Sequence, residues 1–89
     1  MASYKIEWKR SAVKELKQID RPIIPKIIQA VEALAEDPYP AGSKKIRGAE
    51  HTFRIRKGDY RIVYRVYSGR LIVEVVKVGH RKKIYEKSF

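Results

Sequence analysis

Three arginines, Arg54, Arg56 and Arg61, lie at strand-like spacing on either side of the dipeptide Gly58-Asp59. Side chains two residues apart on a strand share a face, and a two-residue hairpin turn at that dipeptide places Arg56 opposite Arg61. Like charges at this cross-strand distance cost stability unless an anion binds them. Guanidinium groups carry paired donors that match the oxygens of phosphate. The spacing therefore predicts an anion site, with phosphate as the favoured ligand.

Basic side chains are concentrated in the second half of this 89-residue chain. Residues 44–87 hold fourteen Lys and Arg against four Asp and Glu, whereas residues 1–43 hold seven against six. A region with this much self-repulsion usually meets a polyanion, and nucleic acid is the commonest one for a domain of this size. A merely solubilising surface would spread its charge more evenly. We expect nucleic-acid contacts from the cations around the arginines: Lys44, Lys45, Arg47, Lys57, Arg65, Lys82 and Lys83.

The composition limits the other possibilities. A chain of 89 residues is expected to form a single domain, 1–89. It contains no cysteine, and its two histidines do not make a zinc site without help from carboxylates, so neither a metal nor another cofactor is expected. Neither a signal peptide nor a membrane span of roughly 18 apolar residues stands out, which predicts a cytoplasmic protein without membrane contact.

The first half of the chain predicts one strand and two helices. Tyr4–Trp8 alternates between apolar and charged side chains as a strand does, and apolar residues then recur at helical spacing over Arg10–Ile19. Asp20 stands where a second helix needs its N-cap, and the pair Asp37-Pro38 ends that helix. The two helices are expected to pack as a hairpin with one apolar side.

The rest of the chain is typical of a meander of antiparallel strands. The predicted strands and turns are, in order, Lys44–Arg47, His51–Lys57, the turn Gly58-Asp59, Tyr60–Tyr67, the turn Ser68-Gly69 and Arg70–Val78. A two-residue second turn pairs Tyr67 with Arg70 and Val63 with Glu74. Gly79 is then expected to let the chain leave the strand.

Alternation assigns each residue of the meander to one of two faces. The face predicted to lie under the helices holds Phe53, Ile55, Tyr60, Ile62, Tyr64, Val66, Leu71, Val73 and Val75. The open face holds the arginines and an apolar strip of Val63, Tyr67, Ile72 and Val76. The predicted fold class is α+β in the order β-α-α-β-β-β-β, an antiparallel meander sheet with an N-terminal strand and an αα-hairpin packed on one face.

Three segments of this sequence resemble the RelE-type toxins of the RelE/ParE toxin–antitoxin superfamily. They are Ile-Arg-Gly at 46–48, Gly-x-Tyr-Arg-Ile-Val-Tyr at 58–64, and Val-Gly-x-Arg followed by a tyrosine at 78–85. The resemblance covers nearly the whole chain and implies a microbial-RNase-like fold. It also implies a toxin of a type II toxin–antitoxin system that acts as a metal-independent, ribosome-dependent endoribonuclease. Such an enzyme cleaves mRNA in the ribosomal A site and so inhibits translation.

The resemblance implies roles for single residues. Arg61 and Arg81 match the family's transition-state and leaving-group arginines, and Tyr85 matches a C-terminal tyrosine near the target base. Arg54 and Arg56 stand where RelE itself has lysines. This departure matters because the 2′-OH nucleophile must lose a proton, and a guanidinium stays protonated at neutral pH and is a poor base.

Three residues are candidates for the proton acceptor. They are His80, because imidazoles titrate near neutral pH, then Lys57 and His51. Alternatively, little base catalysis is needed, because the ribosome aligns the 2′-OH while the arginines stabilise the charge of the phosphorane. We favour this second account, with His80 as a proton carrier.

The resemblance also implies partners. These are a cognate acidic RelB-like antitoxin, the ribosome with its rRNA and A-site mRNA, and operator DNA only through the antitoxin. The antitoxin is expected to cover the apolar strip and the Arg81–Tyr85 tail. Two other functions stay open: a ParE-like inhibitor of DNA gyrase that acts by protein contact, and a non-catalytic RNA-binding module built on Arg54, Arg56 and Tyr67.

Overall fold

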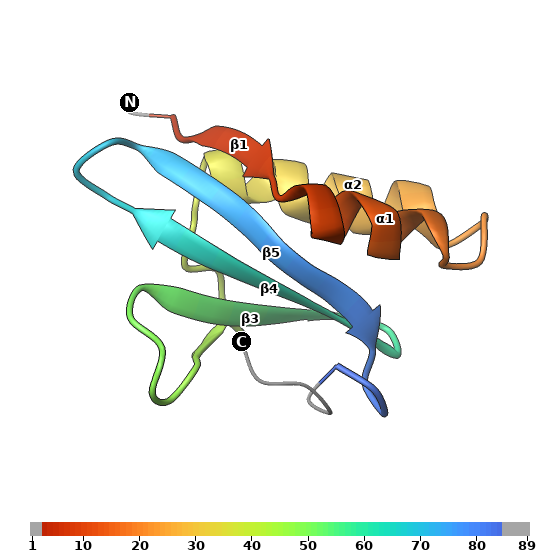
Figure 1. The fold of residues 1–89 in the computed structure, drawn as a ribbon. Coiled ribbons are helices and arrows are strands. Elements are labelled where there is room, and N and C mark those ends of the chain that lie inside the picture. The colour runs from red at the N-terminus through yellow and green to blue at the C-terminus, as the bar shows by residue number, and fades with distance from the viewer. Residues whose placement is uncertain (1–2, 85–89) are drawn as a thin grey trace.

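Two helices cover one face of a five-stranded sheet in the computed structural model, which describes residues 3–84 (Figure 1). The elements in chain order are β1 Lys5–Trp8, α1 Arg10–Lys17, α2 Ile24–Glu32, the 3₁₀ helix η1 Ala33–Ala35, β2 Lys44–Lys45, β3 Thr52–Lys57, β4 Tyr60–Tyr67 and β5 Ile72–His80. The predicted α+β class and the placement of both helices on one face are confirmed. Within residues 3–84, no helix is long and apolar enough to span a membrane.

The strand order is β1-β5-β4-β3-β2, which puts the first strand at one edge, beside the last. β1 runs parallel to β5, with Lys5 opposite Ile72 and Trp8 opposite Val75, whereas the other neighbours are antiparallel. A parallel pair needs a long connection, which the helices and the meander together supply. The sheet is therefore mixed, and only its four-stranded β2–β5 part is the predicted antiparallel meander.

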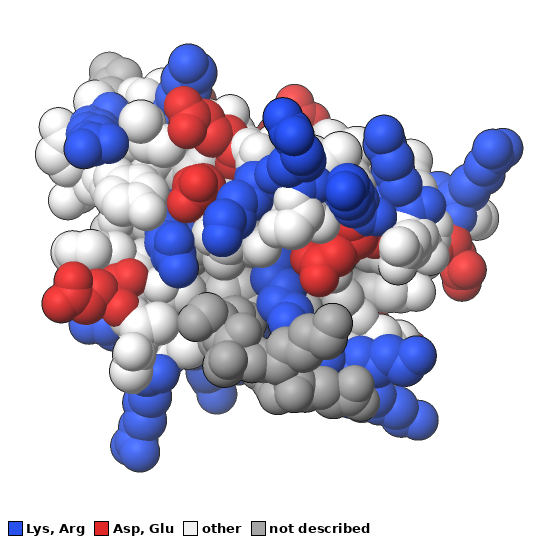
Figure 2. Space-filling view, in the orientation of Figure 1, with Lys and Arg blue, Asp and Glu red and all other residues white. Residues whose placement is uncertain are grey.

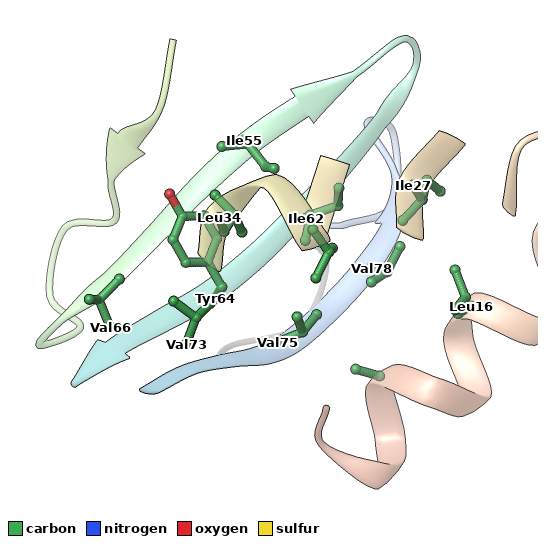
Figure 3. Packing of buried hydrophobic residues seen from close by; sticks show 12 residues of the cluster. Leu16, Ile27, Leu34, Ile55, Ile62, Tyr64, Val66, Val73, Val75 and Val78 are labelled. Atoms are coloured by element: carbon green, nitrogen blue, oxygen red, sulfur yellow. The ribbon is translucent and has the colours of Figure 1, made fainter. Parts of the chain in front are cut away.

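The core lies between the helices and the sheet and is largely aliphatic (Figure 3). Leu16, Ile27 and Leu34 reach it from the helical layer. The sheet contributes residues that alternation assigned to this face: Ile55, Ile62, Tyr64, Val66, Val73 and Val75 are buried, and Phe53 and Tyr60 pack against them. The hydroxyl of the fully buried Tyr64 donates to the Pro38 carbonyl at 2.7 Å. The predicted covered face is thus confirmed except at Leu71.

The second helix begins later than the position of Asp20 predicted. α2 starts at Ile24, Pro25 lies in its first turn, and its N-cap residue Ile23 makes no side-chain cap. Asp20 instead begins a turn, because its carbonyl accepts the Ile23 N–H at 2.9 Å. The N-cap prediction is wrong. A proline loses little in the first turn of a helix, where its missing N–H has no intrahelical partner, and Pro25 suits this later start.

The first hairpin of the meander has the predicted register. Lys57 faces Tyr60 and Arg56 faces Arg61 across a two-residue turn. Gly58 has a φ of 58°, a left-handed conformation that glycine adopts without strain, which explains its place at the first position of the turn.

The second hairpin does not have the predicted two-residue turn. Tyr67 pairs with Ile72 rather than Arg70, so the four residues 68–71 connect β4 to β5. Leu71 has a φ of 55° in this loop and is 39% exposed, so its predicted place on the core face is wrong. The Leu71 carbonyl accepts the Lys5 N–H at 2.8 Å. Pairing with β1 thus also fixes the position of β5. The residues of the 68–71 turn do not reveal this constraint.

A bulge shifts the register further along the same pair of strands. Tyr64 pairs with Val75 but Val63 pairs with Lys77, so Val76 is the extra residue. Lys77 therefore takes the place that was predicted for Val76 on the open face. The two strands keep their buried faces together on both sides of this irregularity.

Two further expectations are corrected by the same register. Glu74 faces Arg65, so the predicted pair of Val63 with Glu74 is wrong. Gly79 does not end the strand, because β5 continues through it to His80. The chain turns only after that residue.

Candidate functional site

The face of the sheet away from the helices carries at least one cation on every strand of the meander. We call this surface the arginine face. The register places these basic residues on it: Lys44 on β2, Arg54 and Arg56 on β3, Arg61 and Arg65 on β4, and Lys77 on β5. Basic side chains also project from the helical side, with acids among them (Figure 2). The arginine face is therefore distinguished by its paired arginines rather than by charge alone.

One end of the arginine face has an acidic partner. Glu74 lies 3.9 Å from Arg65, and the Tyr67 hydroxyl donates to the same carboxylate at 3.5 Å. Arg65 and Glu74 are both partly buried, with 33% and 26% of their side chains exposed. Arg56 and Arg61 face each other at the other end of β4. Glu74 thus forms an ion pair with Arg65 and lies at the opposite end of β4 from the Arg56–Arg61 pair.

Arg61 is directed by the hairpin turn next to it. Its Nη1 donates to the carbonyls of Gly58 and Tyr60, at 3.0 Å each. These bonds hold the guanidinium at the end of the sheet, half-buried beside the turn. The turn that sets the register of β3 and β4 therefore also sets the orientation of this arginine.

Arg81 contacts the same turn. Its backbone N–H donates to the Asp59 carbonyl at 2.7 Å, and its Nε lies 3.6 Å from Asp59 Oδ1. Gly79, two residues before it, pairs with Arg61. The structure thus brings Arg61 and Arg81, which are far apart in the sequence, into contact with the same two-residue turn.

The segment after β5 folds back tightly. The N–H groups of Lys83 and Ile84 both donate to the His80 carbonyl, at 2.8 and 2.9 Å. Ile84 is buried, and a Cβ atom built on Gly79 would lie 3.2 Å from its Cδ1. Gly79 thus leaves space for Ile84 above the strand and does not mark an exit from it.

His80 does not lie on the arginine face. It pairs with Tyr60, and the two rings meet edge to face at 5.6 Å on the helix-covered side of the sheet. Its Nδ1 accepts the Lys82 N–H at 3.1 Å. Because a neutral imidazole carries one proton, this bond favours the tautomer with the proton on Nε2. In this geometry the nitrogen that could accept a further proton is already occupied.

The other two candidate bases also lie away from the arginine face. Lys57 pairs with Tyr60 and lines a cleft with Lys26 of α2, on the helical side. His51 precedes β3, where Thr52 pairs with Arg65, so it lies at the opposite end of the hairpin from Arg61. The structure therefore brings none of the three proposed proton acceptors onto the face that carries the arginines.

The remaining residues predicted to contact nucleic acid lie at β2, in the loop after it and in the turn after β5. Lys45 pairs with Phe53, on the opposite face from Lys44, and Arg47 follows in the exposed loop after β2. Lys82 and Lys83 are exposed in the turn after β5. Tyr85 lies outside the described residues. Within residues 3–84, no cluster of His, Cys, Asp or Glu could hold a metal ion.

Two acidic residues that the sequence did not single out touch this region. Asp59 contacts Arg81, and Glu15 of α1 accepts the Val78 N–H of β5 at 3.1 Å. Glu15 also lines a cleft of about 440 Å³ beside His80 and Lys83. Asp59 had one local signal, since it is the acid in the hairpin turn between the arginines. Glu15 had none, because its partner lies 63 residues away.

Comparison with known proteins places this chain in a family. Residues 6–85 match the family described as the ParE toxin of the type II toxin–antitoxin system parDE. Because this match spans most of the chain, the chain belongs to that family. It is a toxin of a type II toxin–antitoxin system.

Relatives define the branch of the superfamily. A candidate RelE-like toxin protein of Escherichia coli is 29% identical over 82 residues, covering 90% of this chain and 85% of the relative. The toxin–antitoxin complex RelBE2 of Mycobacterium tuberculosis contains a chain with a TM-score of 0.78 and 25% identity, over 90% of this chain and 100% of that one. The RelB–RelE complex of Methanococcus jannaschii gives a TM-score of 0.70 and 28% identity, over 90% and 95%. The chain is thus a RelE-type toxin of the RelE/ParE superfamily.

Proposed function

We propose that this toxin is a ribosome-dependent endoribonuclease that cleaves mRNA in the ribosomal A site and so stops translation. One observation supports this above the others: the turn Gly58-Asp59 gathers Arg61 and Arg81, beside Arg56, at one end of the arginine face. Guanidinium groups held beside one another suit a phosphate whose negative charge grows during a reaction.

The proposed reaction uses the RNA itself as the nucleophile. The ribose 2′-oxygen attacks the adjacent phosphorus and loses its proton, and the bond from phosphorus to the 5′-oxygen breaks. The products are a 2′,3′-cyclic phosphate and a 5′-OH, whose oxygen gains a proton. Arg61 and Arg81 would stabilise the phosphorane and the leaving oxygen, while Arg54 and Arg56 bind neighbouring phosphates.

The placement of the three base candidates favours a mechanism with little base catalysis by the toxin. His80, Lys57 and His51 all lie off the arginine face. We therefore propose that the ribosome aligns the 2′-OH and that the arginines supply most of the catalytic effect by electrostatic stabilisation. His80 could carry a proton only after giving up its bond to the Lys82 N–H.

Removal of either arginine tests this function. Arg61→Ala and Arg81→Ala should each lower the cleavage rate about 10²- to 10³-fold and relieve growth arrest, because each removes a donor to the transition state. Primer extension on mRNA from induced cells locates the cuts. Arg70→Ala, in the exposed 68–71 loop, is the matched control and should cleave normally. Growth arrest by either site variant at wild-type expression would contradict the mechanism.

Inhibition of DNA gyrase is the second candidate, favoured by the description of the matching family as a ParE toxin. A supercoiling assay with purified gyrase separates the two. Inhibition of supercoiling without mRNA cuts would assign the protein to the gyrase-directed class. Cuts without inhibition would support the endoribonuclease.

We further propose that a cognate acidic RelB-like antitoxin neutralises this toxin through the arginine face. The solved relatives named above are toxin–antitoxin complexes. The apolar strip there is narrower than predicted, because Val63 is buried, Tyr67 and Ile72 are half-buried, and Lys77 takes the place predicted for Val76. An antitoxin segment must therefore bring Asp or Glu to the guanidinium groups.

Hydrogen exchange with and without the antitoxin tests this mode of inhibition. New protection is expected in the 54–61 hairpin and the 79–84 segment. Protection confined to α1 and α2 would exclude it.

A further inference from the structure

Asp59 makes two contacts with Arg81 that differ in kind. Its carbonyl accepts the Arg81 N–H at 2.7 Å, which fixes the backbone after β5, and its Oδ1 lies 3.6 Å from Nε. Both side chains are exposed, 54% for Arg81 and 65% for Asp59. The Asp59 carboxylate contacts the Nε edge of the Arg81 guanidinium.

The contact is to Nε, so it does not use the terminal nitrogens Nη1 and Nη2 of the guanidinium. A guanidinium binds phosphate best through two parallel donors, and a rigid fork must be held in one direction to do so. The same turn directs Arg61 through the Gly58 carbonyl. The turn thus orients one arginine by its backbone and the other by its carboxylate.

We infer that Asp59 is a positioning residue for Arg81. Its carboxylate holds the Nε edge, so that the terminal nitrogens point toward a phosphate bound between Arg61 and Arg81. This inference rests on the proposed endoribonuclease function and adds to it a residue that does not itself touch the RNA.

A simpler role for Asp59 is formation of the turn. The choice of substitution distinguishes this role from the positioning of Arg81. Gly58 has the positive φ of a hairpin turn that takes glycine first, and Asp, Asn and Ser are all common at the position after it. Asp59→Ser keeps the turn chemistry and removes the carboxylate. Asp59→Asn keeps the turn and an acceptor oxygen but removes the charge.

The effect of removing the Asp59 charge on RNA binding provides a second way to distinguish the two roles. Asp59 is an acid beside a site for a polyanion, so its removal alone should strengthen RNA binding. A positioning role predicts the opposite for the chemical step, because a misdirected guanidinium loses its transition-state contact even when the complex forms. The rate at saturation and the affinity should therefore move in different directions.

The experiment measures single-turnover cleavage of mRNA on preformed ribosome complexes at saturating toxin. Asp59→Ser should lower the rate about tenfold or more without weakening ribosome binding, and Asp59→Asn should lower it less. Glu50→Gln, an equal change of charge in the loop before β3, should leave the rate unchanged. In an Arg81→Lys background, which has no Nε edge, Asp59→Ser should add little further loss. A wild-type rate for Asp59→Ser, or losses that multiply in the double variant, would overturn the inference.

A measurement on the free protein keeps the test independent of the proposed function. The Nε–Hε group of Arg81 should exchange with water more slowly than that of an exposed arginine such as Arg70, and Asp59→Ser should remove this difference in NMR exchange rate. If the wild type fails to cleave mRNA, the proposed function fails, and this signal still decides whether Asp59 orients Arg81. An unchanged signal in Asp59→Ser would refute that orientation.

Discussion

Arg56 and Arg61 face each other across β3 and β4, which places two like charges at cross-strand distance. Arg61 offsets part of their repulsion by donating to the Gly58 and Tyr60 carbonyls. The pairing is easier to explain by what it binds than by what it contributes to folding, since opposed like charges in a sheet are destabilising. At the residue scale, the same arginine pair that suits an anion therefore lowers the stability of the fold.

Removal of one of these charges should stabilise the protein. We expect Arg56→Gln to raise the free energy of unfolding by a few tenths of a kcal/mol at low salt, because it relieves the repulsion of Arg61. At high salt the gain should disappear, since screening weakens interactions between exposed charges. Urea unfolding at low and high salt measures this, with Arg70→Gln in the 68–71 loop as the control. A lower stability of Arg56→Gln at low salt would contradict the Arg56–Arg61 register.

Tyr64 provides a second prediction at this scale, in the core. Burial raises the pKa of Tyr64 from 10.0 to about 12, and its hydroxyl donates to the Pro38 carbonyl at 2.7 Å. The folded state thus favours the neutral phenol, so this contribution to stability is full below pH 10 and is lost as pH rises toward 12.

We expect Tyr64→Phe to lose about 1 kcal/mol near neutral pH, because the Pro38 carbonyl is left without its donor. Its unfolding free energy should then fall less steeply than that of the wild type between pH 10 and 12. Urea unfolding across that range compares the two. Parallel curves would show that Tyr64 does not titrate with unfolding.

At the scale of elements, β5 positions the site. It is held by β1 on one edge and by β4 on the other, and its bulge at Val76 moves Lys77 onto the arginine face. The Glu15 carboxylate on α1 accepts the Val78 N–H, which anchors the last part of the strand to the helical layer. The turn that follows then carries Arg81 to Asp59.

The contact of Gly79 with Ile84 makes this segment sensitive to a single methyl group. Gly79→Ala should cost about 1 to 3 kcal/mol, because the new Cβ would lie 3.2 Å from Ile84 Cδ1. Ile84→Val removes that Cδ1 and should recover part of the loss in the double variant, although alone it is destabilising. A double-mutant cycle from urea unfolding measures the coupling. Strictly additive losses would contradict this packing.

At the scale of the whole molecule, the charge decides how the toxin meets a large partner. The arginine face combines cations from four strands, and further cations lie in the turn after β5. Binding of such a surface to RNA releases counterions, so affinity depends steeply on salt.

Ribosome binding should therefore weaken by about 10³-fold or more between roughly 50 and 200 mM salt. Arg54→Gln should lower the slope of log affinity against log salt by about one, because one phosphate contact is lost. Lys5→Gln on β1, whose side chain pairs with Glu7 at 3.8 Å, is the control and should leave the slope unchanged. Sedimentation with ribosomes measures both. Binding that does not respond to salt would favour a protein target such as gyrase.

Local sequence determined those features of this protein that depend on neighbours in the chain. Alternation assigned Ile62, Tyr64 and Val73 to the covered face, and they are buried. The two-residue turn after Lys57 set the opposition of Arg56 and Arg61. These features follow from side-chain period and turn chemistry, which act over a few residues.

Only the tertiary structure decided the features that depend on distant segments. The register of β5 follows from its pairing with β1 as well as with β4, and the bulge at Val76 has no local signal. That register turns His80 toward Tyr60 and away from the arginines, and it brings Arg81 to Asp59. The candidate arginines could thus be found in the sequence, whereas their arrangement could not, because it is set by contacts between residues that only folding brings together.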